Sequence, residues 1–193
     1  MNRPLMTLVL AATCAGVVIA AQKEWSFPNT KPNGRATVEY RHEGLHIVAN
    51  YDYSQRNHKT SWLLIDLAAA STRRFVLHKA DVKLLTPNGR ELSVAPQQAL
   101  LGDSSGITFV LQNAQIFRRQ LDSYFTQRET SDPIKFQIAP GQGTTSDEAI
   151  VDNDRVAKGA IFFRTPEGSW DAGTYRLEVD TDVAKAALPI ALQ

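Results

Sequence analysis

The residues best suited to chemistry in this sequence are His42, Glu43 and His46, which form the pattern H-E-x-x-H. On a helix, this spacing places two imidazoles one turn apart, where they can bind zinc while the glutamate activates water for hydrolysis. The chemistry therefore depends on the element that carries the motif. One interpretation of the sequence is a zinc-dependent hydrolase that uses these three residues.

The surrounding sequence favours a hairpin over a helix. Apolar and polar residues alternate on both sides of the motif, and a glycine lies inside it. If residues 43 and 44 form a two-residue turn, His42 faces Leu45, His46 faces Arg41, and the two imidazoles point to opposite faces. In a single extended strand they would lie about 13 Å apart, whereas zinc–nitrogen bonds are about 2 Å long. We therefore predict a hairpin here, without catalytic residues or metal ligands.

A second candidate site is the acidic stretch between residues 147 and 154. It offers the carboxylate and amide oxygens that calcium prefers, but its spacing does not fit an EF-hand. Such residues also serve as turn formers on solvated loops. The sequence leaves calcium binding open and predicts no cofactor. The residues concerned are Asp147, Glu148, Asp152, Asn153 and Asp154.

We predict a protein that is not an enzyme. The sequence Gly-Asp-Ser-Ser-Gly at residues 102 to 106 matches the G-x-S-x-G pattern, but no nucleophile elbow is predicted, and Cys14 is the only thiol. Most aromatic residues are expected in the core. Trp170 lies in a turn sequence and is expected either to be exposed as a binding aromatic or to plug one end of the fold. We take Trp170, Asp152 and Asp154 as a candidate binding surface.

Residues 1 to 21 predict a secretory signal peptide, because one Arg and a Pro precede an uncharged run that ends in small side chains. The run is shorter than the roughly 20 apolar residues that span a bilayer, which favours cleavage before Ala21 or Gln22 over an uncleaved anchor. The residues before Cys14 do not fit a lipidation signal. We expect a periplasmic or secreted protein with no stable membrane span after cleavage.

Cleavage would leave a chain without cysteine, so its own core must stabilise it without disulfides. It would also remove one of the 21 Lys and Arg residues, leaving as many cationic as anionic side chains against 20 Asp and Glu. This balance gives no electrostatic reason to expect nucleic acid or an anionic membrane as partner. The expected partner is a protein or a small ligand of the envelope, whose identity the sequence does not give.

The organisation predicted from hydrophobic periodicity is mainly β. Residues 22 to 35 contain Pro, Asn and Gly and are expected to form an irregular lead-in to a single domain over residues 36 to 193. One amphipathic helix is predicted over residues 107 to 125, with Ser104 or Ser105 as its cap. The other predicted features are a hairpin over 36 to 51, strands over 62 to 67, 75 to 77, 82 to 85, 91 to 95, 134 to 138, 156 to 163, 174 to 179 and 188 to 192, and a loop over 140 to 155.

The segment Asp171-x-Gly173-x-Tyr175 resembles the tyrosine corner of immunoglobulin-like β-sandwich domains. The resemblance implies that the Tyr175 hydroxyl bonds the backbone a few residues upstream and fixes the turn between two strands. It also implies that Trp62 is the buried Trp of the opposing strand. The chain is similar in style to uncharacterised secreted bacterial proteins with one such domain, which implies a fold and no activity. We expect a non-enzymatic binding or interaction module that acts through sheet edges or loops.

Overall fold

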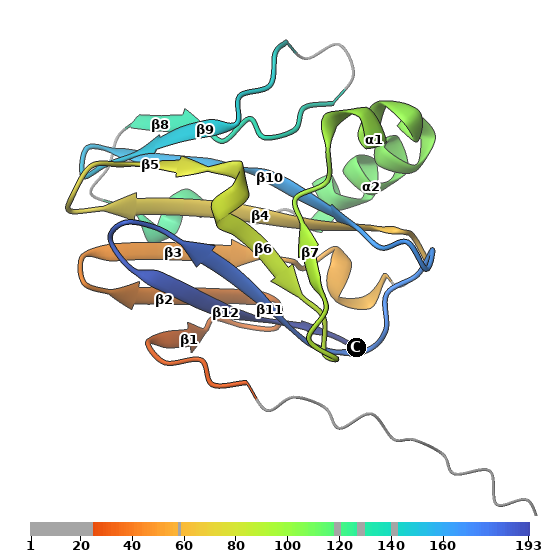
Figure 1. Ribbon diagram of the computed structural model, residues 1–193, viewed down its shortest axis with the longest axis horizontal. Coiled ribbons are helices and arrows are strands. Elements are labelled where there is room, and N and C mark those ends of the chain that lie inside the picture. Colours follow the sequence, from red (N-terminus) through yellow and green to blue (C-terminus); the bar gives the residue numbers. More distant parts are fainter. Residues whose placement is uncertain (1–24, 58, 118–120, 127–129, 140–142) are drawn as a thin grey trace, which may run out of the picture.

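Two β-sheets face each other across the main apolar core in the computed structural model (Figure 1). The structure describes residues 25 to 57, 59 to 117, 121 to 126, 130 to 139 and 143 to 193. The expected signal peptide, Cys14 and the first residues of the lead-in lie outside the described residues. The larger sheet has the order β1 (Thr30–Pro32), β2 (Thr37–His42), β3 (Leu45–Asn50), β4 (Trp62–Ser71), β10 (Arg155–Arg164) and β8 (Thr130–Pro133). Only β8 pairs in parallel in this sheet.

The smaller sheet has the order β12 (Lys185–Leu192), β11 (Gly173–Asp180), β6 (Val82–Leu85) and β7 (Glu91–Ser93). A separate antiparallel pair, β5 (Phe75–His78) and β9 (Glu148–Val151), extends the core. The helices are α1 (Gln97–Gly102) and α2 (Ser104–Phe117), with short 3-10 turns at Ser54–Arg56, Lys79–Asp81 and Leu121–Tyr124. The mainly β class expected from periodicity is confirmed.

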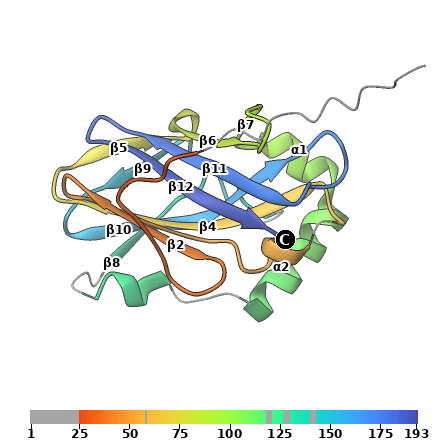
Figure 2. The ribbon, with the colours of Figure 1, turned by 90° about the horizontal axis from the view of Figure 1, so that it is seen from below.

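The larger sheet is buried on both faces, and β4 shows this most clearly. All ten of its residues are buried, as predicted for a central strand. Its odd-numbered side chains, such as Ile65, join residues of the smaller sheet in the main core. On the other face of this sheet, Trp62 and Leu64 pack with residues of α1 and α2, whereas Ala68 and Ala70 pack with Leu121 and Phe125 (Figure 2).

Trp62 belongs to the helical side of the larger sheet, which corrects the role implied by the resemblance. It is 1% exposed and packs with the residues of α1 and α2 instead of lying between the sheets. Its indole Nε1 donates to Oδ2 of Asp103 at 2.8 Å. The other carboxylate oxygen of Asp103 accepts from the backbone N–H of Gly106 at 3.1 Å. Asp103, rather than Ser104 or Ser105, therefore caps α2, and the helix begins three residues earlier than predicted.

Several predicted boundaries are wrong. The lead-in contains β1, which pairs with β2, and the predicted loop over 140 to 155 contains β9. No strand spans 134 to 138, and β8 ends at Pro133. In the 134 to 138 segment the side chain of Gln137 replaces backbone pairing, since it donates to the carbonyls of Ala95 and Phe162 at 2.7 and 2.8 Å. The short helix α1 was not predicted.

The edges of the sheets offer little backbone to a partner strand. Strand β12 is the longest edge, and it contains Pro189, which has no N–H to donate. The hydroxyl of Tyr40, from the opposite sheet, donates to the carbonyl of Lys185 on β12 at 3.4 Å. Strands β1, β7 and β8 have three or four residues each. Short and covered edges are the usual protection against edge-to-edge pairing. No helix in the described residues is long and apolar enough to cross a membrane.

Candidate functional site

The H-E-x-x-H motif lies in a tight hairpin, as the alternation predicted. Strand β2 ends at His42, β3 begins at Leu45, and the two turn residues have φ of 48° and 80°. This left-handed pair is typical of the two-residue turns that match the twist of a hairpin. His42 is opposite Leu45, and His46 is opposite Arg41. The two imidazoles therefore point to opposite faces of the sheet, so the geometry does not support the zinc hydrolase interpretation.

His46 has a structural partner that the sequence analysis missed. Its Nε2 lies 2.7 Å from Oε1 of Glu39, which precedes Arg41, the residue opposite His46, by two positions on β2. The ring of His46 lies 4.3 Å from that of Phe125. Burial works to raise the pKa of Glu39, but hydrogen bonds from Arg41 and Asn33, together with the charges of Arg41 and His46, outweigh it and lower this pKa. Glu39 and His46 thus join β2, β3 and the segment that carries Phe125.

The acidic stretch is divided by β9. Asp147 precedes this strand and is 83% exposed, whereas Asp152 follows it and is buried. The carboxylate of Asp152 accepts from the backbone N–H of Arg155 at 2.8 Å and from its guanidinium at 3.0 Å. Burial works to raise the pKa of Asp152, but these hydrogen bonds outweigh it and lower the pKa. Asp152 therefore closes the turn into β10. No group of His, Cys, Asp or Glu able to hold a metal ion occurs in the described part of the chain.

Trp170, Asp152 and Asp154 do not form one surface, which corrects the candidate binding surface. The two acidic residues precede β10 and Trp170 follows it, so the ten residues of β10 separate them by about 30 Å. Asp154 is exposed, and its backbone N–H donates to Asp152 at 3.0 Å. Trp170 is 4% exposed and belongs to the main core. Of its two expected roles, it has that of a plug at the end of the sheets.

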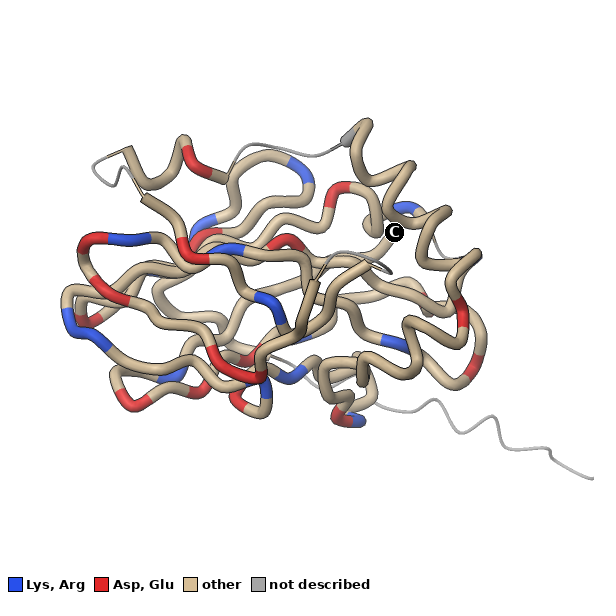
Figure 3. Tube along the Cα trace, turned by 90° about the horizontal axis from the view of Figure 1, so that it is seen from above, with Lys and Arg blue, Asp and Glu red and all other residues tan. Residues whose placement is uncertain are grey.

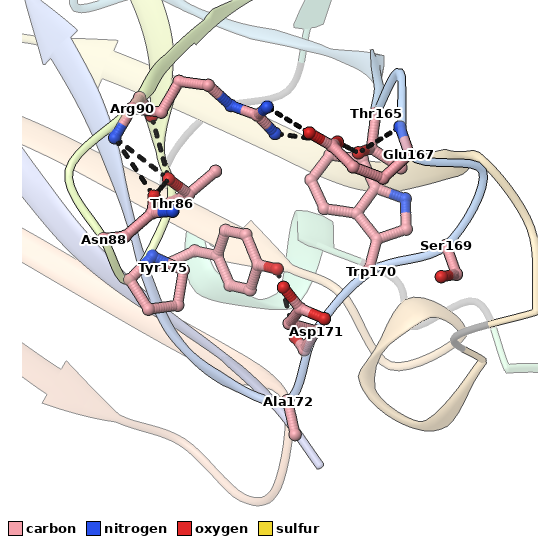
Figure 4. A pocket seen from close by; sticks show the side chains of 11 residues that line it. Thr86, Asn88, Arg90, Thr165, Glu167, Ser169, Trp170, Asp171, Ala172 and Tyr175 are labelled. Carbon is pink, nitrogen blue, oxygen red and sulfur yellow. Dashed lines mark hydrogen bonds and ion pairs between the residues drawn. The ribbon is translucent and has the colours of Figure 1, made fainter. Parts of the chain in front are cut away.

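A cavity with a volume of about 320 Å³ lies beside Trp170 (Figure 4). We call it the end pocket. It is formed by the turn between β6 and β7, the loop between β10 and β11, and the third residue of β11. Its lining residues are Thr86, Pro87, Asn88, Arg90, Thr165, Glu167, Ser169, Trp170, Asp171, Ala172 and Tyr175.

The turn between β6 and β7 holds one wall of the end pocket through its own hydrogen bonds. The backbone N–H of Thr86 donates to the carbonyl of Arg90 at 2.8 Å, and the N–H of Arg90 donates to the Thr86 hydroxyl at 3.0 Å. The hydroxyl of Thr86 also bonds the side-chain oxygen of Asn88. These bonds close the turn that was predicted from Pro87, Asn88 and Gly89, and they fix the start of the Arg90 side chain.

Arg90 joins the two loops across the end pocket. Its two terminal nitrogens pair with the two carboxylate oxygens of Glu167, and the Thr165 hydroxyl donates to the same carboxylate (Figure 4). Hydrogen bonds from Arg90 and then Thr165 lower the pKa of Glu167 to about 2. The carboxylate therefore stays ionised over a wide pH range, and Arg90 and Glu167 form a bidentate pair that ties the loops together.

Two buried aromatic rings form the floor of the end pocket. The rings of Trp170 and Tyr175 lie 5.6 Å apart and are inclined at 65°. The Tyr175 hydroxyl donates to the backbone carbonyl of Asp171 at 3.0 Å, and Gly173 starts β11 between them with φ of 146°. Burial, with the nearby charge of Asp171, raises the pKa of Tyr175 to about 12. The hydroxyl is thus held in its neutral, donating form.

The chain matches no protein-family model, no curated protein and no solved structure.

The sequence predicted one part of the end pocket and missed the rest. Trp170 and Tyr175 were singled out, and both segments that form the walls were predicted as turns. The pairing of Arg90 with Glu167 joins residues 77 positions apart. No local pattern carries that information, because the two turns meet only when β7 and β10 are placed in space.

Proposed function

We propose that the protein is a secreted or periplasmic, non-enzymatic binding module on an immunoglobulin-like sandwich, and that it takes a small polar ligand in the end pocket. The observation that carries this proposal is the pocket itself. Its volume of about 320 Å³ lies at the small end of the range for ligand sites, about 300 to 1,000 Å³. It combines a buried aromatic floor with a polar rim, as ligand sites commonly do.

The loops that form the end pocket are attached to paired strands. Strand β10 pairs with β4 over eight residues, and β11 pairs with β12 over eight residues. Function in such folds often lies on loops held by a rigid scaffold. The short, covered sheet edges make recognition by strand addition the weaker alternative. The bond from Tyr175 to Asp171 supports the immunoglobulin-like part of the proposal, since that contact is the one the resemblance implies.

The proposed location rests on the signal-like sequence of residues 1 to 21. Mass spectrometry of the protein recovered from an envelope fraction tests it directly. A mature chain that begins at Ala21 or Gln22 is expected. Recovery of the full-length chain in the cytoplasm would contradict secretion.

A ligand screen tests the binding function. We expect some members of a set of sugars, amino acids, amines and carboxylic acids to raise the melting temperature and to shift the NMR signal of the Trp170 indole N–H. Ser169→Trp adds bulk at the exposed rim of the end pocket and should abolish these effects. Ser105→Trp, at an exposed serine of α2, is the matched control and should preserve them. The proposal is overturned if no compound shifts the Trp170 signal, or if Ser169→Trp binds normally.

A further inference from the structure

The charges around the end pocket do not balance. Arg90, Glu167 and Asp171 are its three charged residues. The guanidinium of Arg90 is already matched by the carboxylate of Glu167 through two parallel contacts. Within the described residues, the carboxylate of Asp171 has neither a hydrogen bond nor an ion pair, although its backbone carbonyl accepts from Tyr175. The end pocket therefore carries a net charge of about one negative unit.

Asp171 lies where a ligand would meet it. In Figure 4 the Arg90–Glu167 pair lies on one side of the end pocket, and Asp171 lies on the other, next to the Tyr175 hydroxyl. The negative charge of Asp171 reaches the Tyr175 hydroxyl and contributes to the rise of its pKa to about 12. The same negative potential attracts a cation.

Two further features act in the same direction. The aromatic floor of Trp170 and Tyr175 presents electron-rich rings, which attract cations at their faces and repel anions. An anion would also have to compete with Glu167 for Arg90, the only cationic side chain that lines the pocket in the described structure. The charge and the rings together favour a cationic ligand over a neutral or anionic one.

The rim adds hydrogen-bonding groups without charge. Ser169 is exposed, and Asn88, which lines the pocket, uses its side-chain oxygen within the turn and keeps an amide N–H₂ group that can donate. A hydroxyl and an amide are suited to ligand hydroxyl groups, because each can exchange hydrogen bonds with them. A water molecule occupies about 30 Å³ in the liquid, so the pocket volume of about 320 Å³ corresponds to roughly ten water molecules. This volume suits a ligand of single-sugar size.

We infer that the end pocket binds a small hydroxylated organic cation, such as an amino sugar or an amino alcohol, and that Asp171 provides the charge selectivity. The inference rests on the proposed function, because it assigns a ligand class to the same pocket. Arg90 and Glu167 act as a neutral brace between the loops and do not contribute to the preference for positive charge.

Three sugars of nearly the same shape test the sign of the charge. Glucosamine, glucose and glucuronate are titrated separately into the mature protein, at a slightly acidic pH that keeps the amine protonated, and the Trp170 indole signal is followed by NMR. We expect glucosamine to bind roughly fivefold more tightly than glucose, as one partly exposed charge pair allows, and glucuronate to bind most weakly.

Asp171→Asn should make glucosamine and glucose bind alike while leaving glucose binding unchanged. Asp182→Asn is the matched control, because Asp182 is an exposed acidic residue in the turn after β11, at the other end of that strand. It should leave the preference intact. Equal binding of the three sugars, or a preference that survives in Asp171→Asn, overturns the inference.

The remaining outcomes distinguish failure of the cation inference from failure of the proposed binding function. If none of the three sugars binds but neutral or anionic members of the wider compound set shift the Trp170 signal, the cation inference is wrong and the proposed binding function stands. If no compound of either set shifts that signal, both are wrong.

Discussion

The β2–β3 hairpin and the end pocket show opposite relations between sequence and chemistry. The hairpin contains a recognisable catalytic pattern within five consecutive residues, and the strand geometry points its two histidines to opposite faces. The end pocket has no recognisable catalytic pattern, and the fold brings together Arg90 and Glu167, which are 77 positions apart. Figure 3 shows basic and acidic residues interspersed over the surface, so charge clustering alone does not reveal either region. The spacing of a motif has chemical meaning only on the element that it assumes.

The two regions also differ in what supports them. The floor of the end pocket is part of the main core, because Trp170 and Tyr175 belong to the same buried cluster as the strands. The tip of the hairpin is exposed, and the side chain of His42 is 46% accessible. A ligand site on a buried floor keeps its geometry when the ligand leaves, whereas an exposed tip has few contacts to hold it. Three sets of variants test this difference.

The largest effect is expected from Trp170→Ala. Removing a buried indole from the floor should lower the free energy of unfolding by about 3–5 kcal/mol, through lost burial and the cavity left behind. His42→Ala should change it by less than about 0.5 kcal/mol, as is usual for exposed positions. Urea denaturation of both variants measures the difference. Similar losses in the two variants would mean that the floor and the hairpin tip are equally supported, contrary to the comparison.

An intermediate effect is expected from two glycines whose φ angles are nearly identical. Gly44, in the hairpin turn, has φ of 80°, and Gly168, in the loop of the end pocket, has φ of 79°. A Cβ at Gly44 would lie 2.0 Å from Oγ1 of Thr72, whereas a Cβ at Gly168 has no atom within 4 Å. Both changes to Ala incur the left-handed strain of about 1–2 kcal/mol. Only Gly44→Ala adds a clash, so it should cost about 1 kcal/mol more.

The second substitution Thr72→Ala separates the two contributions. In the Gly44→Ala background it should recover the part of the loss that exceeds the loss in Gly168→Ala, as measured by thermal and urea unfolding. If Gly44→Ala costs no more than Gly168→Ala, the hairpin tip adjusts freely to the added methyl group, and the tight packing of this turn against Thr72 has no energetic weight.

Much of the fold could be predicted from the sequence, because the relevant signals are local. Alternation predicted the hairpin, and the doubly apolar run from Trp62 predicted a strand with both faces covered. The errors came from non-local contacts. Gln137 replaces a strand pairing with side-chain bonds, and Trp62 lies under the helices, where its indole bonds Asp103. Likewise, the sequence singled out Trp170 as a binding residue or a plug, but it did not predict the neighbouring pair of Arg90 and Glu167. That pair forms only because two loops distant in sequence meet in space.

The smallest effects are expected from the acidic residues that each region holds in an ion pair. The pKa of Glu167 is lowered from 4.5 to about 2 by its bonds to Arg90 and Thr165. Its contribution to stability is therefore complete above pH 4.5 and is lost as the pH falls towards about 2. Glu167→Gln should be less stable than the parent protein above this window, and the two should converge within it.

Glu39 in the hairpin also has a lowered pKa, but its side chain is 10% accessible, against 53% for Glu167. Its contribution is also lost on acidification, from its ordinary pKa of 4.5 downwards. Solvent screens the exposed pair more than the buried one, so Glu39→Gln should destabilise the protein more than Glu167→Gln at neutral pH. Unfolding free energies measured across the acidic range test both statements. A larger loss for Glu167→Gln would place the stronger ion pair at the end pocket, and the brace between its loops would then be a principal stabilising contact of the fold.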